Sequence, residues 1–274
     1  MEQMVMGRSS ADPVVSAISI DPALIFPLAG MTPDRWQVGV LRSRSKRLMM
    51  CCSRQCGKTL CAAALALTTS LGSSCRKTLI LSRTQRQSSE LHRDKILPMY
   101  RALGSPLRSG RPPSALGMEL ANGSRIVCLP GNDNSVVGYS SIDMLIIDEG
   151  ARVPDNLYKA VRPFLAVSNG RLVVLSTPFG KRGWFYEAWF GTNSGGSGDV
   201  DSREPLKRKD GWARFFALAK DCPRISAEFL RDERVELGPR WYAQEFENSY
   251  QDQVGSVFSH QDIFDALDDC VTPM

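Results

Sequence analysis

The stretch "SRQCGKT", Ser53 to Thr59, decides how the rest of this 274-residue chain is interpreted. It follows the apolar run "LMMCC" and precedes the Ala/Leu-rich stretch "KTLCAAALALTTSLG", which closes on Gly72. A strand, a short loop and a helix in this order bring backbone N–H groups and the positive end of a helix to one point, where they can bind phosphate. The stretch therefore predicts a phosphate-binding loop between a buried strand and a helix.

The loop departs from the full pattern G-x-x-x-x-G-K-[ST] because Cys52 stands at its first position. The first glycine mainly eases a tight turn, so a loop that enters by a different turn tolerates the cysteine. A bare Gly-Lys-Thr is a weak signal, and the prediction depends on the strand before it and the helix after it. In such a loop Lys58 would reach the β- and γ-phosphates of a nucleotide, and the Thr59 hydroxyl would bind Mg²⁺.

A second element, "DMLIIDEGA" (143–151), is an apolar strand that ends in two consecutive acids. Asp148 is placed to hold the Mg²⁺ shell, and Glu149 is placed to polarise the attacking water of nucleotide hydrolysis. The alternative is that these acids only cap the next turn. The phosphate loop about 90 residues upstream and the intervening strand at 77–82 favour the catalytic interpretation and suggest the additional-strand class of P-loop ATPases.

A third element, "LVVLSTPFGKRGWFYEAW" (172–189), begins as a strand that ends in Ser176 and Thr177. Hydroxyl groups at this position would sense the γ-phosphate or the water. They would transmit the state of the γ-phosphate or water to the rest of the protein. An ordinary strand-to-loop turn is the alternative interpretation.

Short apolar runs alternate with helical stretches from residue 30 to about residue 190. Most of the runs are apolar throughout, which is typical of strands covered by helices on both faces and predicts a mostly parallel α/β sheet flanked by helices. The expected strands are 47–53, 77–82, 125–130, 144–149 and 171–177. The expected helices follow the loop, occupy 85–97 with a stop near Pro98, and flank Gly238 near the end of the chain.

Composition limits the function classes. The net charge of +5 permits an anionic partner without requiring one. The eight cysteines lack the spacing of a disulfide framework, and two histidines leave few candidates for histidine-based catalysis. The sequence shows no signal peptide and no apolar run near the roughly 20 residues that span a bilayer, so we expect a soluble, intracellular protein.

Four stretches together carry a family resemblance that none carries alone. "SRQCGKT", "MLIIDEGARV", "LSTPFGKRGWFYEAW" and "RWYAQEFENSYQDQVGSVF" resemble the large subunit of a tailed-bacteriophage terminase, the motor that packages viral DNA. The resemblance covers residues 30 to 270. Residues 1–30 look like a loosely ordered leader. The resemblance implies a P-loop ATPase core of the additional-strand, RecA-like class (31–211) and a small helical lid (212–260), followed by a linker (261–274). The nuclease domain of such subunits would begin where this chain ends, so we expect no DNA cleavage from it.

The resemblance also implies roles for residues of the loop and its surroundings, with ATP and Mg²⁺ as cofactors. Arg54 matches a family arginine that stabilises charge on the γ-phosphate, and Gln37 in "TPDRWQ" matches the residue that reads adenine. A surface arginine and a plain helix-start glutamine are the alternatives. The implied nucleotide contacts are Gln37, Ser53, Arg54, Gln55, Cys56, Gly57, Lys58 and Thr59, with Thr59 and Asp148 on the metal. The implied catalytic residues are Glu149, Lys58 and Arg54, and the coupling residues are Ser176 and Thr177.

One family feature is missing from the expected position. Many relatives carry an arginine that acts on the ATP of a neighbouring subunit, and this chain has Val137 there. A trans-acting arginine must then come from elsewhere, with Arg152 and Arg125 as the candidates, or this assignment fails in this chain.

The segment 76–111 contains nine Lys and Arg residues against Glu90 and Asp94. Phosphate contacts from such a segment would be independent of DNA sequence, as a translocating motor requires. A solvated helix beside a basic loop is the alternative. The residues expected on DNA are Arg101, Arg108 and Arg111.

The resemblance implies double-stranded DNA, a portal protein and the small terminase subunit as partners, and no membrane. It implies a homo-oligomeric ring on the portal, a monomer in isolation, and a viral or prophage-encoded protein that acts in the host cytoplasm and is absent from the mature virion. Two other functions stay open at this point: a helicase-like nucleic-acid-dependent ATPase, and an assembly adaptor that binds nucleotide without hydrolysing it.

Overall fold

The computed structural model describes residues 12–131, 138–190 and 210–251. Within these residues the chain forms one seven-stranded sheet in the order β3-β4-β2-β5-β6-β1-β7. All neighbouring strands are parallel except β3, which pairs antiparallel with β4. The strands are β1 (Arg47–Cys52), β2 (Lys77–Ser82), β3 (Gly117–Glu119), β4 (Arg125–Pro130), β5 (Met144–Asp148), β6 (Arg171–Ser176) and β7 (Trp212–Ala217). The expected mostly parallel α/β fold is confirmed.

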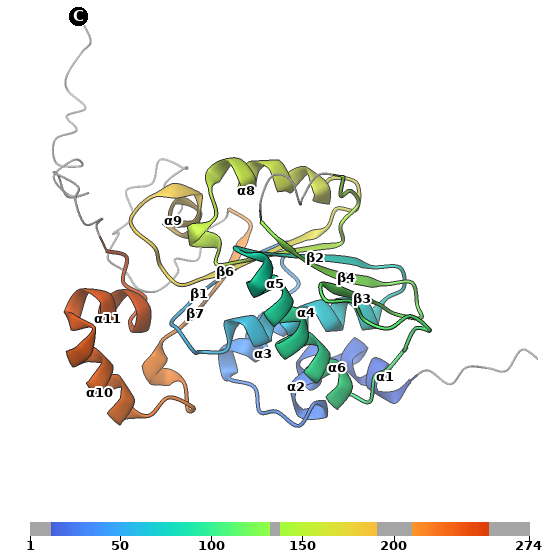
Figure 1. Cartoon of the computed structure of the whole chain (residues 1–274), viewed down its shortest axis with the longest axis horizontal. Coiled ribbons are helices and arrows are strands. Elements are labelled where there is room, and N and C mark those ends of the chain that lie inside the picture. The colour runs from blue at the N-terminus through green and yellow to red at the C-terminus, as the bar shows by residue number, and fades with distance from the viewer. Residues whose placement is uncertain (1–11, 132–137, 191–209, 252–274) are drawn as a thin grey trace, which may run out of the picture.

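Helices cover both faces of this sheet (Figure 1). One face carries α1 (Pro13–Ile20), α2 (Ile25–Leu28), α3 (Arg35–Arg42), α4 (Lys58–Gly72), α5 (Gln85–Leu91) and α6 (Leu97–Ala102). The other face carries α8 (Asp155–Val161) and α9 (Gly183–Phe190). The helices α10 (Ala227–Glu236) and α11 (Gly238–Phe246) lie at the side of the molecule (Figure 1). Short 3-10 segments complete the described structure: Pro22–Leu24, Gly150–Arg152, Arg162–Leu165 and Ala219–Asp221.

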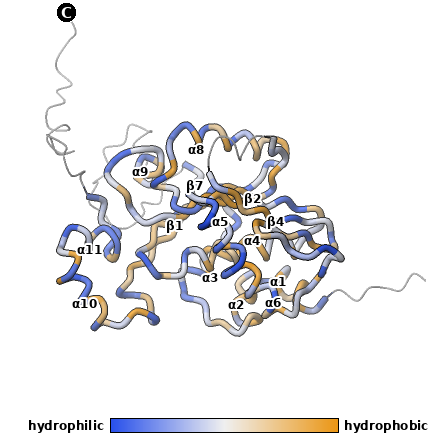
Figure 2. The backbone as a smooth tube through the Cα atoms, in the orientation of Figure 1, coloured by the Kyte–Doolittle hydropathy of each residue, from blue (hydrophilic) through white to orange (hydrophobic). Residues whose placement is uncertain are grey.

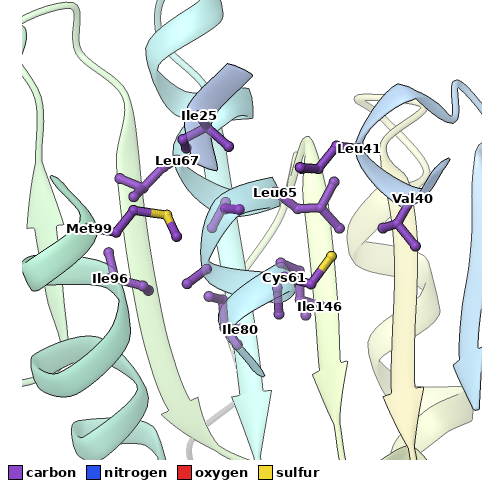
Figure 3. Close-up of a cluster of buried hydrophobic side chains, with 14 of the residues drawn as sticks. Ile25, Val40, Leu41, Cys61, Leu65, Leu67, Ile80, Ile96, Met99 and Ile146 are labelled. Carbon is purple, nitrogen blue, oxygen red and sulfur yellow. The ribbon is translucent and has the colours of Figure 1, made fainter. Parts of the chain in front are cut away.

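The hydrophobic core lies above and below the strands, because successive side chains of a strand point to opposite faces. Leu48 and Met50 face α4, whereas Met49 and Cys51 face α8 and α9. In Figure 2, which colours the backbone trace by residue hydropathy, hydrophobic residues follow the strands at the centre of the molecule. Figure 3 shows Leu65 of α4 within the cluster that includes Ile146 of β5. Each such buried aliphatic side chain stabilises the fold by about 1.5–3 kcal/mol.

The first helices of the chain correct one expectation. Residues 1–30 were expected to form a loosely ordered leader, but α1 and α2 pack on the α4 side of the sheet. Ile18, Ile25 and Phe26 are buried there. The reason is their apolar spacing, which gives these short helices a face that is stable only against the core. Residues 1–11 lie outside the described residues.

The boundary between core and lid differs from the expected residue 211. Strand β7 pairs in parallel with β1, so the sheet of the core extends to Ala217. The small unit beyond it has its own apolar cluster of Ala219, Leu230, Tyr242 and Phe246. Most of the Gly/Ser-rich and charged stretch 191–211 lies outside the described residues, as do the end of the expected lid and the linker 261–274.

The helix expected over 85–97 does not stop at Pro98. A π-helical turn, His92–Ile96, follows α5, and α6 continues to Ala102. In this turn the N–H of Leu97 donates to the carbonyl of His92, five residues earlier, so the α-helical hydrogen-bond ladder is already interrupted where the proline enters. The proline then stands in the first turn of α6, where a missing N–H costs little.

The order of strands places the two chemically important loops close together. Strand β6 lies between β1, which leads into the phosphate loop, and β5, which carries the acids. Strand β2 (77–82), expected as the intervening strand, lies on the far side of β5 and is intervening in sequence only. Since parallel strands end at the same edge of a sheet, the segments after β1, β5 and β6 meet there. Among the described residues, no helix is both long and apolar enough to cross a membrane.

Candidate active site

The phosphate loop lies between the end of β1 and the start of α4, as expected. Gln55 (φ 60°) and Gly57 (φ 87°) both adopt left-handed backbone conformations. A side chain at Gly57 would bring a Cβ within 2.9 Å of the Gln37 Nε2. The backbone angle at Gly57 therefore favours glycine, and a Cβ there would in addition displace the Gln37 amide.

The loop presents unpaired donors and one cation. Within the described residues, the structure shows no acceptor for the backbone N–H groups of residues 55–59. The Lys58 ammonium donates to the carbonyls of Cys52 (2.7 Å) and Ser53 (2.8 Å) and so lies across the loop. Free N–H groups at the positive end of a helix, beside an ammonium, are the features of a site for phosphate.

Asp148 ends β5 at the same edge of the sheet. It is half-buried, and one of its carboxylate oxygens accepts a hydrogen bond of 2.9 Å from the backbone N–H of Glu149. Burial raises the pKa of Asp148 to about 6, and the neighbouring Glu149 contributes to this rise, while Lys58 opposes it. A carboxylate in this position is short of positive charge, and a divalent cation would stabilise its ionised form.

Glu149 follows in a left-handed conformation (φ 53°), which is uncommon for a residue with a side chain. The next residue, Gly150, has no room for a Cβ, which would lie 2.4 Å from the Val174 Cγ1. The sequence Asp-Glu-Gly thus forms a tight exit from the strand. The Glu149 carboxylate accepts a hydrogen bond of 3.2 Å from the Gln87 side-chain amide.

The oxygen atoms near Asp148 fit a hard divalent cation. Strand pairing of Leu81 with Ile147 sets Ser82 beside Asp148, and both residues follow the alternation that faces α4. The Ser82 hydroxyl is buried without a hydrogen-bond partner among the described residues. No group of three or more His, Cys, Asp and Glu side chains in the described part suits a metal. A cation here would therefore depend on Asp148 and Thr59, with phosphate oxygens and water completing its shell, which is how proteins bind Mg²⁺.

The first residues of the loop are joined to α11 rather than left free for a ligand. The Arg54 Nε lies 2.5 Å from a carboxylate oxygen of Glu245, and the Arg54 backbone N–H donates to the Glu245 carbonyl (2.8 Å). The Ser53 hydroxyl donates to the carbonyl of Phe246 (2.7 Å). The expected roles of Ser53 and Arg54 at a nucleotide stay predictions, and in this structure both connect the loop to the lid.

Gln37 is buried beside the loop with both ends of its amide engaged. Its oxygen accepts from the N–H of Asp34 (2.8 Å), and its nitrogen donates to the Gly57 carbonyl (3.3 Å). Gln37 therefore caps the first turn of α3 and supports the phosphate loop. Its expected contact with adenine stays a prediction.

Ser176 and Thr177 lie at the end of β6, between the two loops. The Ser176 hydroxyl accepts a hydrogen bond of 3.1 Å from the backbone N–H of Ala151, two residues after Glu149. This contact connects the end of β6 to the acidic segment. The expected coupling role is consistent with the position and stays a prediction.

Three further residues around the site had no role predicted from the sequence. Asn248 donates to the carbonyls of Cys51 (3.1 Å) and Ala217 (2.9 Å) and so joins the ends of β1 and β7. Arg224 forms two hydrogen bonds to Asp34 and one of 3.3 Å to the carbonyl of Cys56 in the loop. Gln87, the third, contacts Glu149. Only their positions in the fold reveal them, because each is far in sequence from what it touches.

Neither candidate for a trans-acting arginine is free. Arg152 stacks over the Phe179 ring (4.0 Å from guanidinium carbon to ring centre) and lies 3.8 Å from Glu245. Arg125 begins β4, at the edge of the sheet opposite to the phosphate loop, and pairs with Glu119. Val137 lies outside the described residues. The source of a trans-acting arginine is therefore not assigned.

The basic segment 76–111 contains both arginines with carboxylate partners and arginines without them in the described part of the chain. Four of its residues have carboxylate partners: Arg76, Arg86, Arg93 and Arg111. The three arginines expected on DNA, Arg101, Arg108 and Arg111, line one hollow of about 390 Å³ between α6 and β3. Arg101 and Arg108 are exposed and have no carboxylate partner among the described residues. These positions stay a prediction for DNA contact.

The fold and the site together define a P-loop nucleotide-binding domain of the additional-strand class. The model of the family "Terminase large subunit, T4likevirus-type, N-terminal" matches residues 49–263, and the chain belongs to this family. Terminase large subunits of Thermus virus P23-45 and Thermus phage G20c are each 23% identical over 87% of this chain. This chain spans about half the length of these curated relatives, 53% of each.

Solved structures show the same fold. The ATPase domain of the large terminase of Thermus phage P74-26 has a TM-score of 0.67 and 23% identity, over 82% of this chain and 97% of that one. The large terminase of a thermophilic bacteriophage, in complex with ADP, has a TM-score of 0.58 and 15% identity, over 80% of this chain and 54% of that one. The expectation of a terminase large subunit, based on four short stretches, is thus confirmed at the level of family and fold.

Proposed function

We propose that this chain is the ATP-hydrolysing motor domain of a terminase large subunit, which moves double-stranded DNA into a procapsid. The observation that supports this most directly is the arrangement at one edge of the sheet. The acid pair Asp148–Glu149 ends β5, the phosphate loop follows β1, and one strand separates the two. Family membership and a relative solved with ADP support the same function.

The phosphates of ATP bind at the free N–H groups of residues 55–59 in this proposal. Lys58 exchanges the carbonyls of Cys52 and Ser53 for the β- and γ-phosphate oxygens, at little cost because it already lies over the loop. Thr59 and Asp148 hold the Mg²⁺ ion, which when bound neutralises charge on the phosphates. Glu149 accepts a proton from the attacking water or orients it.

Arg54 supplies the remaining positive charge. Its guanidinium is at present paired with Glu245, and its side chain is 60% exposed, so it is free to turn when a γ-phosphate offers a stronger partner. Stabilising charge that develops during the reaction is the role in which a single donor has the largest effect on rate.

The DNA side of the proposal depends on the arginine-lined hollow. Arg101, Arg108 and Arg111 would contact backbone phosphates, which gives binding without sequence preference. As partners we propose a portal protein, the small terminase subunit and further copies of this chain in a ring on the portal. The proposed place of action is the host cytoplasm.

Measurement of ATP turnover by the purified protein, with and without DNA and portal, tests the proposal. Wild type should hydrolyse ATP in the presence of Mg²⁺. The variant Glu149→Ala should bind ATP with turnover reduced by at least about 100-fold, and Lys58→Ala should weaken both binding and turnover. Glu236→Ala, which removes an exposed acid on α10, is the matched control and should behave as wild type.

Two results would favour the other functions. ATP binding without turnover, even with portal and DNA present, would indicate an assembly adaptor. Strand separation that is independent of portal would indicate a helicase-like enzyme. Unchanged turnover in the Glu149→Ala variant would contradict the assignment of the site itself.

A further inference from the structure

Gln87 joins the start of α5 to the proposed catalytic carboxylate. Its side-chain oxygen accepts from the backbone N–H of Thr84 (3.1 Å), and the Thr84 hydroxyl accepts from the backbone N–H of Gln87 (3.2 Å). This is a capping box, in which two side chains satisfy the first donors of a helix. The amide nitrogen of the same side chain donates to the Glu149 carboxylate at 3.2 Å.

The contact is fixed by neighbouring elements of the sheet. β2 and β5 are adjacent and parallel, so the loop after β2, which begins α5, lies beside the acids after β5. The capping box uses the oxygen of the Gln87 amide and leaves the nitrogen for Glu149. The geometry of the cap therefore determines which atom of Gln87 faces the carboxylate.

Among the described residues, no other side chain or backbone group donates to the Glu149 carboxylate. The backbone of Glu149 is fixed by its left-handed conformation, but this does not set the rotation of its carboxylate. A carboxylate with a single hydrogen bond takes its orientation from that bond. A base acts efficiently only when it is held within reach of the proton that it accepts.

We propose that Gln87 is a positioning residue that holds the Glu149 carboxylate in the orientation needed to activate water. This inference rests on the proposed function, since it assigns Gln87 a part in the hydrolysis carried out by Glu149. Among the described residues Gln87 makes hydrogen bonds to Thr84 and Glu149 and none to the phosphate loop, so its effect should fall on the rate of hydrolysis and not on nucleotide binding. Hydrogen-bond partners of metal ligands typically contribute about 10–100-fold to activity, and we expect an effect of similar size for Gln87.

The chain offers a pair of variants that separates this role from capping. Gln87→Glu keeps a capping-box acceptor, since glutamate is favoured at this position, but it faces Glu149 with a carboxylate oxygen, which repels the Glu149 carboxylate where the amide donated to it. Thr84→Ala removes a partner of the cap and keeps the Gln87 amide. Steady-state ATP turnover gives kcat and KM for both variants and for wild type, and thermal unfolding gives their stabilities.

We expect Gln87→Glu to lower kcat by about tenfold or more with KM within about twofold of wild type, because Glu149 loses the hydrogen bond and gains a like charge beside it. Thr84→Ala should lower the melting temperature and leave kcat unchanged. Gln87→Ala, which removes both hydrogen bonds of the side chain, should show the low kcat as well as the lower melting temperature. It keeps the test decisive if the glutamate variant does not fold.

A wild-type kcat in Gln87→Glu and Gln87→Ala would overturn the inference, and so would an equal fall of kcat in Thr84→Ala, because the effect would then come from the helix start. These results are distinct from failure of the proposed function, which would appear as absent turnover in the wild-type protein and would remove the basis of the inference as well.

Discussion

Arg54 of the phosphate loop and Glu245 of α11 form an ion pair, with 2.5 Å between the Arg54 Nε and a carboxylate oxygen, although 191 residues separate them in sequence. The Glu245 side chain is only 6% exposed and also receives a hydrogen bond from Gln244 (3.2 Å). A buried carboxylate depends on such partners, since removing one leaves a poorly solvated charge. The lid is therefore attached to the loop through the residue expected to act on the γ-phosphate.

The two members of this pair should affect the protein in different ways. Arg54→Ala should reduce ATP turnover by about 100-fold or more, because it removes a donor that stabilises charge in the transition state. Glu245→Gln keeps a hydrogen-bond acceptor for Arg54 while removing the charge, so it should lower the melting temperature and retain turnover. Single-turnover kinetics and thermal unfolding of both variants are the measurements. Equal losses of turnover would mean that Arg54 acts only by holding the lid.

The sequence predicted the centre of the sheet because each central strand is a continuous apolar run. It did not predict β7, "WARFFA", whose run is broken by Arg214. The Arg214 side chain is 2% exposed and pairs with Asp210, so it lies in the interior without interrupting the strand. A charged residue within an apolar run indicates a solvent-exposed position only when no buried partner is available. The sequence does not show that such a partner is present.

The candidate site shows the same difference between local sequence patterns and contacts that only the fold creates. The phosphate loop and the acid pair were predictable because each is a local pattern at the end of a strand. Glu245 and Asn248 were not, since their contacts with the loop depend on how α11 folds back over β1. Gln87 appeared in sequence as an ordinary residue of a basic helix, and only the adjacency of β2 and β5 brings it to Glu149.

The raised pKa of Asp148, about 6 against an ordinary 3.8, gives a prediction for stability. The folded state disfavours the ionised form, so this carboxylate destabilises the ligand-free protein above pH 6, and the penalty disappears as the pH falls toward 3.8. Asp148→Asn should therefore raise the free energy of unfolding by about 1–3 kcal/mol at pH 8 and have little effect near pH 4.

Denaturant unfolding of both proteins at several pH values, without nucleotide, measures this difference. The variant should also lose the stabilisation that Mg²⁺-ATP gives to wild type, because the metal has lost a ligand. A variant that is less stable than wild type at pH 8 would show that the Asp148 charge is already compensated within the chain.

The burial of His92 predicts that stability depends on pH in the opposite direction. Its ring is fully buried at the π-helical turn, and neither ring nitrogen has a partner among the described residues. Burial lowers the pKa of His92 below its ordinary value of 6.5. The unfolded chain therefore takes up a proton near pH 6.5 that the folded chain does not, and stability falls as the pH drops below this value.

His92→Leu should remove this part of the acid sensitivity. Between pH 7.5 and pH 5.5 the loss of unfolding free energy in wild type should exceed that in the variant by up to about 1.4 kcal/mol, as measured by urea unfolding. Asp148 contributes in both proteins and cancels in the comparison. An identical pH dependence in the two proteins would show that the His92 ring is protonated in the folded state or reaches water.

The arginine-lined hollow gives a prediction for DNA binding that depends on salt. Arg101 and Arg108 have no carboxylate partner among the described residues, so their charges are available to phosphates. Arg101→Ala combined with Arg108→Ala should weaken binding to double-stranded DNA of any sequence. It should also reduce the slope of log affinity against log salt concentration by about 2, since each arginine removed leaves one phosphate without its cation.

The matched control is Arg231→Ala combined with Arg240→Ala, which removes the same charge from exposed positions on α10 and α11. Fluorescence anisotropy with duplexes of two unrelated sequences, from about 50 mM to about 200 mM salt, compares the two double variants. If the control pair lowers the slope as much as the pair in the hollow, affinity follows net charge alone. In that case the hollow is not a distinct DNA-binding surface.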